Sequence, residues 1–251
     1  MKPIALITGA TSGIGQATAK LLAHNNYKLI LCGRREDRLK SLEEELSSET
    51  EVTTLNFDVR DREAVFSACQ SLPDSWQEIQ VLINNAGNAH GRSAIQEGSI
   101  DDWEAMIDIN VKGLLYISKA VLPGMVKRNS GHVVNIGSIA GKEVYPGGNV
   151  YCASKFAVDA INQAMRIDLN QYNIKVAAVN PGLVETEFSL VRFKGDTAQA
   201  DKVYDGMKPL VAEDIAEIIH FMLSRPPHVN IADLLVLSND QATSTIINRQ
   251  N

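Results

Sequence analysis

In the segment 151–155, Tyr151 and Lys155 stand four residues apart, and Ser138 lies a short distance upstream. On a helix, residues with this spacing lie on one face, about one turn from each other. A free tyrosine titrates near pH ~10, and a nearby ammonium lowers the pKa of the phenol because it favours the phenolate. We therefore expect Tyr151 to donate and accept a proton, tuned by Lys155, with Ser138 bonded to the reacting oxygen. Given a hydride carrier, such a site reduces a carbonyl or oxidises an alcohol.

A glycine-rich turn near the N-terminus offers a place for that carrier. Residues 3–8 are expected to form a buried strand, and an apolar-periodic helix follows from about residue 14 to residue 25. Between them lies the stretch Gly9-Ala10-Thr11-Ser12-Gly13-Ile14-Gly15. Such a turn lets a pyrophosphate approach the backbone and places it at the N-terminus of the helix. The spacing G-x3-G-x-G departs from the usual G-x-G-x-x-G, and three glycines can also serve a turn alone. The position between the first strand and the first helix favours nucleotide binding.

Strand-like and helical patterns alternate along the whole chain. The strands are expected at 3–8, 28–33, 52–57, 79–84, 132–137, 174–180 and 233–238, and the helices at 13–25, 36–47, 61–72, 101–128 (with a break near Asn110), 150–172 and 213–224. Short apolar strands between amphipathic helices indicate a parallel sheet covered on both faces. We predict an α/β fold, a Rossmann-like doubly wound sheet of about seven strands, in a single domain over residues 1–251.

Composition excludes several classes of partner. The chain carries 24 Lys and Arg against 30 Asp and Glu, a net charge of −6, with no basic block. This balance disfavours nucleic acid and anionic membranes. No apolar run approaches the roughly 20 residues of a membrane span, and the N-terminus enters the first strand without the pattern of a cleavable signal. The scattered cysteines, Cys32, Cys69 and Cys152, favour a reducing, cytoplasmic location, and the five histidines show no metal-type spacing.

Several short motifs follow one another in an order known from one family. They are Thr8-Gly9-x3-Gly13-x-Gly15, Asp58-Val59, Asn84-Asn85-Ala86-Gly87, Asn110, Ser138, Tyr151-x3-Lys155 and Pro181-Gly182. On these residues the chain resembles the classical short-chain dehydrogenases/reductases. Within that family it is most similar to the NADP-dependent 3-hydroxy acid dehydrogenases that accept serine and allo-threonine. This narrower resemblance depends on Val191-Arg192-Phe193-Lys194-Gly195, His228-Val229-Asn230-Ile231 and the tail Asn248-Arg249-Gln250.

The end of the second strand indicates which dinucleotide is used. An acidic residue there would hold the ribose 2′-hydroxyl of NAD, whereas Arg34 and Arg35 suit the 2′-phosphate of NADP(H). The planar fork of an arginine can grip a phosphate in two places. We expect Arg35 to be the main phosphate ligand and Arg34 the second. The alternative is that both arginines only begin the next helix, solvated or paired with Glu36 or Asp37.

The resemblance implies further cofactor contacts. Asp58 would accept a hydrogen bond from the adenine, assisted by the Val59 backbone, and the turn of Asn85, Ala86 and Gly87 would lie along the adenosine. Thr8 would tie the first turn to its neighbour. Pro181 and Gly182 would pass close to the nicotinamide, whose carboxamide would contact Val184 and Thr186.

The resemblance also implies the catalytic roles. Tyr151 would exchange the proton of the substrate hydroxyl, and Ser138 and Tyr151 would both bind that hydroxyl. Lys155 would lower the pKa of Tyr151 and hold the nicotinamide ribose. Asn110 would break its helix and use its backbone carbonyl to hold a water beside Lys155, which completes a proton relay.

The interval of about 185–212 has the charged and small residues of a mobile substrate lid, although an ordinary surface excursion is the alternative. A 3-hydroxy acid needs a cation for its carboxylate, and we expect Arg192 to supply it, with Lys194 as runner-up. Arg192 can instead be a solvated surface residue.

Two other functions stay open: an NADPH-dependent reductase of a ketone, sugar or acyl-carrier ketoester, and a non-catalytic nucleotide-sensing regulator on the same fold.

The apolar faces of the helices at 101–128 and 150–172 suit either core or subunit contacts. In related enzymes these helices meet across a two-fold axis, so the resemblance implies a homotetramer.

Overall fold

Seven strands form one parallel sheet at the centre of the protein. The computed structural model describes residues 2–250 and places these strands in the order β3-β2-β1-β4-β5-β6-β9. Every neighbouring pair is parallel. The strands are β1 (Ile4–Thr8), β2 (Lys28–Gly33), β3 (Val52–Asn56), β4 (Ile79–Asn84), β5 (Gly131–Ile136), β6 (Ile174–Pro181) and β9 (Asp233–Val236). The predicted doubly wound α/β fold is confirmed.

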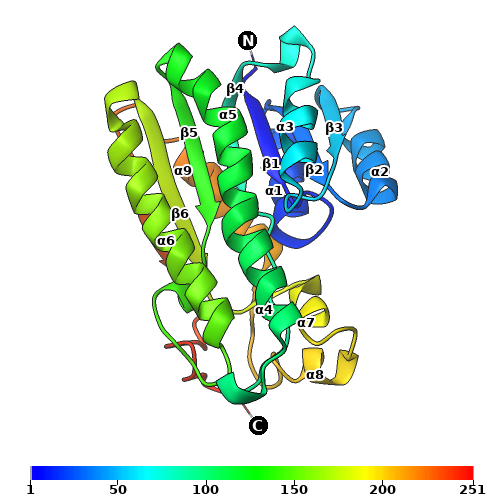
Figure 1. Cartoon of the computed structure of the whole chain (residues 1–251), viewed down its shortest axis with the longest axis vertical. Coiled ribbons are helices and arrows are strands. Elements are labelled where there is room, and N and C mark those ends of the chain that lie inside the picture. The colour runs from blue at the N-terminus through cyan, green and yellow to red at the C-terminus, as the bar shows by residue number, and fades with distance from the viewer. Residues whose placement is uncertain (1, 251) are drawn as a thin grey trace.

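Each strand contributes to two hydrophobic cores, because successive side chains of a strand point to opposite faces of the sheet. In β1, Ile4 and Leu6 belong to one core, and Ala5 and Ile7 belong to the other. The first core is covered by α3 (Arg62–Gln70), α5 (Leu114–Arg128) and α6 (Asn149–Leu169), which lie in front of the sheet in Figure 1. The second is covered by α1 (Gly13–His24), α2 (Glu36–Leu46) and α9 (Ala212–Leu223). Strands covered on both faces explain the near-continuous apolar runs in the sequence.

The helix expected over residues 101–128 consists of three pieces. α4 (Ile100–Ile107) leads into a π-helical segment (Asp108–Gly113), and α5 follows it. The break expected near Asn110 is therefore present, as an insertion of π-helix. Such insertions are rare in helices and frequently mark functional sites.

The interval 185–212 contains short elements that the sequence patterns did not predict. They are α7 (Glu187–Arg192) and α8 (Thr197–Asp201), and the parallel pair of β7 (Val184–Glu185) and β8 (Leu210–Val211) joins the two ends of the interval. Each element is too short for a periodicity to show in the sequence. In Figure 1, α7 and α8 lie below the carboxyl ends of the central strands.

The order of the strands creates a crevice at those carboxyl ends. The chain moves from β1 to β2 and β3 on one side, and then crosses back to β4 and β5 on the other. The loops after β1 and β4 therefore diverge, and ligands of such sheets bind between them.

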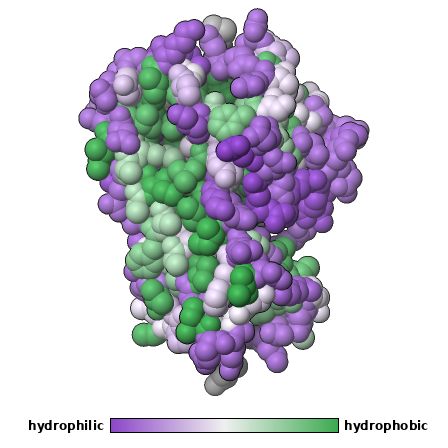
Figure 2. All heavy atoms as spheres, viewed as in Figure 1, coloured by the Kyte–Doolittle hydropathy of each residue, from purple (hydrophilic) through white to green (hydrophobic). Residues whose placement is uncertain are grey.

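One face of the molecule is markedly apolar. Figure 2 shows hydrophobic residues along the outer sides of α5 and α6, whereas the side formed by α2 and α3 is hydrophilic. Leu115, Phe156 and Ile167 are 41%, 41% and 75% exposed on these two helices. In the part of the chain that is described, no helix is long and apolar enough to cross a membrane.

Candidate active site

A cleft of about 300 Å³ opens at the carboxyl ends of the strands. Its wall contains most of the residues expected to bind a cofactor or to react: Gly9, Thr11, Ser12, Gly13, Ile14, Arg34, Arg35, Val59, Asn85, Ala86, Gly87, Ser138, Tyr151, Lys155, Pro181, Gly182, Val184 and Thr186. Gly15, Asp58, Asn110 and Arg192 lie beside or behind this wall. Residues from most of the chain therefore converge on one site.

The glycine turn has a backbone that only glycine fits well. Gly9 and Gly13 have φ values of +65° and +50°, in the left-handed region that side chains disfavour. A Cβ on Gly15 would lie 2.3 Å from the carbonyl oxygen of Gly9. Ser12, the N-cap of α1, makes no side-chain capping bond. The first N–H groups of α1 are therefore available to a phosphate, which fits the proposed dinucleotide.

Thr8 joins this turn to the loop after β4. Its Oγ1 accepts hydrogen bonds from the backbone N–H groups of Asn85 and Ala86, both at 3.0 Å. In return, Nδ2 of Asn85 donates to the carbonyl oxygens of Thr8 and Gly9 at 2.9 and 3.1 Å. The two diverging loops are thus held at a fixed separation across the crevice.

The two arginines at the end of β2 have different partners. Arg35 lies on the glycine turn, where it donates to Oγ1 of Thr11 at 3.0 Å and to Oγ of Ser12 at 2.8 Å. It also pairs with Glu187 at 2.9 Å. The alternative pairing of Arg35 with Glu36 or Asp37 is not found. Arg34 instead pairs with Asp58 at 3.4 Å. Arg35 thus contacts the glycine turn directly, whereas Arg34 contacts Asp58.

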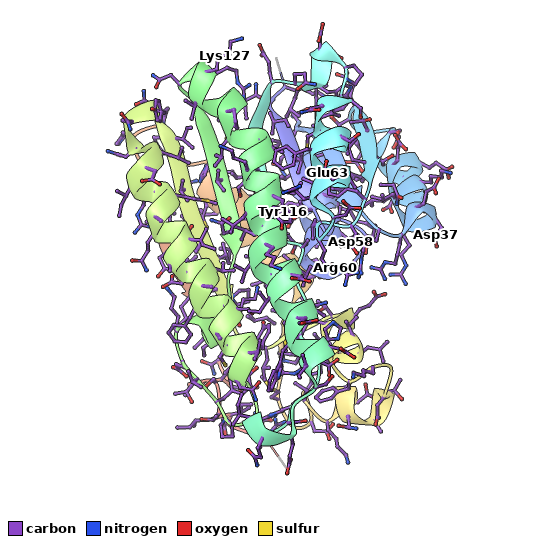
Figure 3. All side chains as sticks on the ribbon, viewed as in Figure 1. Asp37, Asp58, Arg60, Glu63, Tyr116 and Lys127 are labelled. Carbon is purple, nitrogen blue, oxygen red and sulfur yellow. The ribbon has the colours of Figure 1, made fainter. Side chains whose placement is uncertain are left out.

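Asp58 is held mainly by Arg60, a residue that the sequence analysis did not select. Nη2 of Arg60 donates to Oδ2 of Asp58 at 2.7 Å, and the Arg60 backbone N–H donates to Oδ1 at 3.0 Å. Figure 3 shows the two residues side by side at the lower end of α3. Burial alone would raise the pKa of Asp58, but the hydrogen bonds and charge of Arg60 and the charge of Arg34 lower it overall. Asp58 is therefore an anion that stabilises the loop beside Val59, which lines the cleft.

Ser138, Tyr151 and Lys155 lie together in the cleft and are each at most 8% exposed. Tyr151 and Lys155 are one turn apart on α6, as their spacing predicted. Oγ of Ser138 accepts a hydrogen bond from the backbone N–H of Ala140 at 3.0 Å, and the Ser138 hydroxyl lowers the pKa of the Tyr151 phenol. Nζ of Lys155 donates to the carbonyl oxygen of Ile136 at 2.9 Å. The expected acid/base group is thus assembled from the end of β5 and the first turns of α6.

Burial has the largest effect on the pKa of Tyr151, and the expected effect of Lys155 on that pKa stays a prediction. Burial raises the pKa of Tyr151, and the main opposing contributions come from the Ser138 hydroxyl and the positive charge of Arg192. Burial also lowers the pKa of Lys155 to about 8. Desolvation therefore disfavours the charged form of both groups. Burial thereby favours the neutral phenol of Tyr151, the form that donates a proton.

Asn110 uses its whole side chain to fix the loop after β4. Oδ1 accepts from the backbone N–H of Asn88 at 2.8 Å, and Nδ2 donates to the Asn88 carbonyl at 2.9 Å. Nδ2 also donates to Oγ of Ser154 at 3.0 Å. The π-helical segment thus connects the loop after β4 to α6 beside Tyr151. The predicted water held by the Asn110 carbonyl stays a prediction.

Arg192 reaches from α7 to the reacting side of the cleft. Its guanidinium carbon lies 5.4 Å from the centre of the Tyr151 ring and 5.5 Å from that of Tyr145. Nη2 donates to the Tyr145 hydroxyl at 2.9 Å, and Nε donates to the Gly91 carbonyl at 3.2 Å. Arg192 is therefore half-buried and held by the protein, and its role in binding the substrate stays a prediction. Lys194, the runner-up, pairs with Asp102 at 3.0 Å and is 62% exposed.

Besides Arg60, sequence patterns missed four residues of this site. Tyr145 orients Arg192, Phe188 packs on Tyr151 with ring centres 5.7 Å apart, and Arg38 and Glu187 form an ion pair at 2.7 Å. Glu187 and Phe188 directly follow Thr186, which the sequence analysis selected. Their position in the chain could therefore have indicated that they lie near the cleft. Tyr145 and Arg38 belong to no motif, and only the folded chain brings them to the site.

Comparisons with known proteins agree with this geometry. The family model for short chain dehydrogenase matches residues 3–196. NADP-dependent 3-hydroxy acid dehydrogenase YdfG of Salmonella typhi is 48% identical over 229 residues, which are 91% of this chain and 92% of that relative. Sulfoacetaldehyde reductase 2 of Chromohalobacter salexigens is 45% identical over 245 residues, 97% of each chain.

A solved structure is also similar throughout. The closed form of serine dehydrogenase complexed with NADP+ has a TM-score of 0.93 and 43% identity, and the match covers 98% of this chain and 100% of that one. With the glycine turn, the Ser138–Tyr151–Lys155 group and the sheet order in place, the chain belongs to the short-chain dehydrogenase family.

Proposed function

We propose that this protein is an NADP-dependent oxidoreductase that transfers a hydride between the nicotinamide and the 3-hydroxyl or 3-oxo carbon of small 3-hydroxy acids, such as serine, allo-threonine or 3-hydroxyisobutyrate. The observation that carries the substrate class is the Arg192 guanidinium 5.4 Å from the Tyr151 ring, because it sets a cation beside the proposed proton donor. The same assignment draws on the names of the two similar dehydrogenases.

The NADP preference is supported by Arg35 on the glycine turn. Its side chain lies against Thr11 and Ser12, at the N-terminus of α1. Gly9, Gly13 and the backbone of α1 would hold the pyrophosphate. Arg35, with Arg38 and Arg34 nearby, would hold the 2′-phosphate. Val59, Asn85, Ala86 and Gly87 would line the adenosine, and Pro181, Gly182, Val184 and Thr186 would line the nicotinamide.

In the proposed mechanism, the bound nicotinamide supplies or accepts the hydride. Ser138 holds the reacting oxygen of the substrate by a hydrogen bond. Tyr151 gives its proton to that oxygen in the reducing direction and takes it in the oxidising direction. The buried Lys155, whose pKa is about 8, exchanges protons near neutral pH and resupplies Tyr151. Asn110 holds the loop at Asn88 and the start of α6 in a fixed relative position.

The anion of the substrate would bind Arg192. The names of two relatives describe substrates that share one property. A 3-hydroxy acid and sulfoacetaldehyde both place a single carbon between the reacting carbon and the carbon or sulfur of the anionic group. An arginine fork beside Tyr151 suits either anion.

A second function is therefore reduction of a short aldehyde or ketone of another class, above all one that carries a sulfonate. The observation that favours it is the 45% identity with sulfoacetaldehyde reductase 2 across 97% of both chains. The third alternative, a non-catalytic regulator, is disfavoured because Ser138, Tyr151 and Lys155 all line the cleft.

The assembly, the lid and the location belong to the same proposal. The exposed apolar residues of α5 and α6, among them Leu115 and Phe156, support a homotetramer in which these helices meet their copies. The chain would form a single domain. Within it, residues of about 185–212 would move as a lid over the cleft. Free, buried cysteines at 32, 69 and 152 support a cytoplasmic location.

The experiment that tests this proposal is a substrate and cofactor panel. Purified protein is assayed for oxidation of serine, allo-threonine and 3-hydroxyisobutyrate, and for reduction of sulfoacetaldehyde and of neutral ketones, with NADP(H) and NAD(H). The proposal expects the highest kcat/KM with a 3-hydroxy acid and NADP+. Equal values with NAD+ would refute the cofactor assignment. A preference for sulfoacetaldehyde would select the second function, and neutral ketones as the best substrates would refute the role of the anion.

A further inference from the structure

Glu187 connects the lid to the arginines at the edge of the cofactor turn. Its Oε2 accepts a hydrogen bond from Nη1 of Arg35 at 2.9 Å, and its Oε1 accepts one from Nη1 of Arg38 at 2.7 Å. The other nitrogens of Arg35 donate to Thr11 and Ser12. One carboxylate at the start of α7 thus bridges two guanidinium groups, and one of them, that of Arg35, also lies on the glycine turn.

The ion pairs of Glu187 with Arg35 and Arg38 can separate at a low cost in free energy. Arg35, Arg38 and Glu187 are 40%, 43% and 41% exposed, so solvent screens the pairs and lowers the cost of separating them. The hydrogen bond from Arg35 is the largest influence on Glu187 and lowers the pKa of its carboxyl, which is ionised at neutral pH. The Glu187 carboxylate therefore accepts hydrogen bonds from guanidinium N–H groups that could also donate to a phosphate monoester.

We propose that Glu187 is an internal counter-ion that gives up Arg35 and Arg38 to the 2′-phosphate of the cofactor, and that this exchange frees α7 from the cofactor turn. The inference rests on the proposed NADP dependence. Two anions at the same pair of cations repel each other, so the phosphate gains its donors only as Glu187 loses them. A dinucleotide with an unmodified ribose 2′-hydroxyl has no group that displaces the carboxylate.

Two consequences follow from this exchange. Glu187 weakens the binding of every ligand that carries a 2′-phosphate, because its own pairs must first be broken, and it leaves the binding of NAD+ unchanged. The lid also responds to the phosphate alone, since α7 carries both Glu187 and Arg192. Cofactor identity is thereby transmitted to the residue proposed to bind the substrate anion.

The chain offers a matched control in Glu185. It lies two residues before Glu187, is exposed, and pairs with no cation within residues 2–250. Glu185→Gln removes the same charge from the same segment without touching Arg35 or Arg38. This control distinguishes the loss of the ion pairs of Glu187 from a general change in the electrostatic potential of the segment.

The test is calorimetric titration of the full chain with NADP+, NAD+, adenosine 2′-monophosphate and AMP. For Glu187→Gln, we expect the Kd of NADP+ and of adenosine 2′-monophosphate to fall about two- to fivefold, in keeping with an exposed ion pair. The Kd of NAD+ and of AMP stays the same, and Glu185→Gln changes none of the four. If the wild type prefers NADP+ but Glu187→Gln binds it equally or more weakly, this inference is wrong. If the wild type binds NADP+ no better than NAD+, the proposed function itself fails.

Limited trypsin digestion tests the lid separately. Arg192, Lys194 and Lys202 are cleavage sites on or after α7. In the wild type, adenosine 2′-monophosphate should change the cleavage rate at these sites at least twofold, whereas AMP should not. Glu187→Gln without ligand should already be cut at the rate of the liganded wild type. Equal rates in the wild type with and without adenosine 2′-monophosphate would contradict the release of α7.

Discussion

The Arg192 guanidinium of the lid lies over the Tyr151 ring, with its carbon 5.4 Å from the ring centre. Its orientation is set from both sides, because Tyr145 accepts one of its hydrogen bonds and the Gly91 carbonyl accepts another. An arginine is charged at every physiological pH. One residue of the lid can therefore bind a substrate anion and oppose the effect of burial on the pKa of Tyr151.

Arg192→Gln should separate substrate binding from cofactor binding. We expect KM for a 3-hydroxy acid to rise about 10- to 100-fold, because a charge-assisted hydrogen bond contributes roughly 1.5–3 kcal/mol. The Kd of NADP+ should not change, since Arg192 does not line the part of the cleft formed by the glycine turn. Steady-state kinetics at saturating NADP+ and a separate titration of NADP+ measure the two effects.

Two controls make the Arg192 result specific. Arg192→Lys keeps the charge but loses the planar fork, so its KM should lie between those of the wild type and Arg192→Gln. The methyl ester of the same hydroxy acid has no carboxylate, and its KM should be similar in all three proteins. An unchanged KM for the free acid in Arg192→Gln would mean that the carboxylate binds elsewhere.

Tyr151→Phe removes the hydroxyl proposed to exchange the proton while keeping the ring that packs on Phe188. We expect kcat to fall about 10²- to 10⁴-fold in both directions, the usual contribution of a general acid or base. The Kd of NADP+ and the midpoint of thermal unfolding should stay close to those of the wild type. Turnover near the wild-type rate would mean that another group moves the proton.

Much of the fold and the centre of the site followed from the sequence alone. The alternating strand and helix patterns predicted all seven strands of the sheet, because buried parallel strands read as distinct apolar runs. Gly9, Ser138 and Pro181 each follow one of these strands, which predicted that they meet at the carboxyl ends of the sheet. These predictions depend on local spacing, which the sequence displays directly.

What the sequence could not supply was the set of contacts between distant segments. The bond from Lys155 to the Ile136 carbonyl, and the pairing of Arg35 with Glu187 across the cleft, join segments that share no motif. Burial likewise raises the pKa of Tyr151 more than Ser138 and Arg192 lower it, and burial depends on the whole packed site. Residue spacing shows which groups can meet, but not how far each is desolvated.

Lys155 should make stability depend on pH in a defined window. Burial lowers its pKa to about 8, against about 10.5 in an unfolded chain. Between these values the unfolded state binds more protons than the folded state, so this group makes the free energy of unfolding rise with pH. Below pH 8 its charge is buried at full cost. Lys155→Met lacks that cost, and its stability relative to wild type should fall by roughly 2–3 kcal/mol from pH 7 to pH 10.5.

Urea unfolding at several pH values checks this window. The comparison uses differences between each variant and the wild type, so that other titrating groups cancel. Lys119→Met is the control, because Lys119 is exposed on α5 and its removal takes away no buried charge. A pH-independent difference for Lys155→Met would show that the ammonium is not desolvated in the folded protein.

Gly15→Ala should damage the cofactor turn even though alanine favours helices. The new Cβ would lie 2.3 Å from the Gly9 carbonyl oxygen, a backbone atom that cannot move aside without displacing the turn. We expect a loss of about 1–3 kcal/mol in the free energy of unfolding and a higher Kd for NADP+. Gly124→Ala in α5 is the matched control, since its Cβ meets only the flexible end of Arg128 at 3.1 Å. That variant should bind NADP+ like the wild type and be as stable or about 0.5–1 kcal/mol more so. Urea unfolding and NADP+ titration distinguish the two, and equal behaviour of both variants would contradict a tightly packed turn.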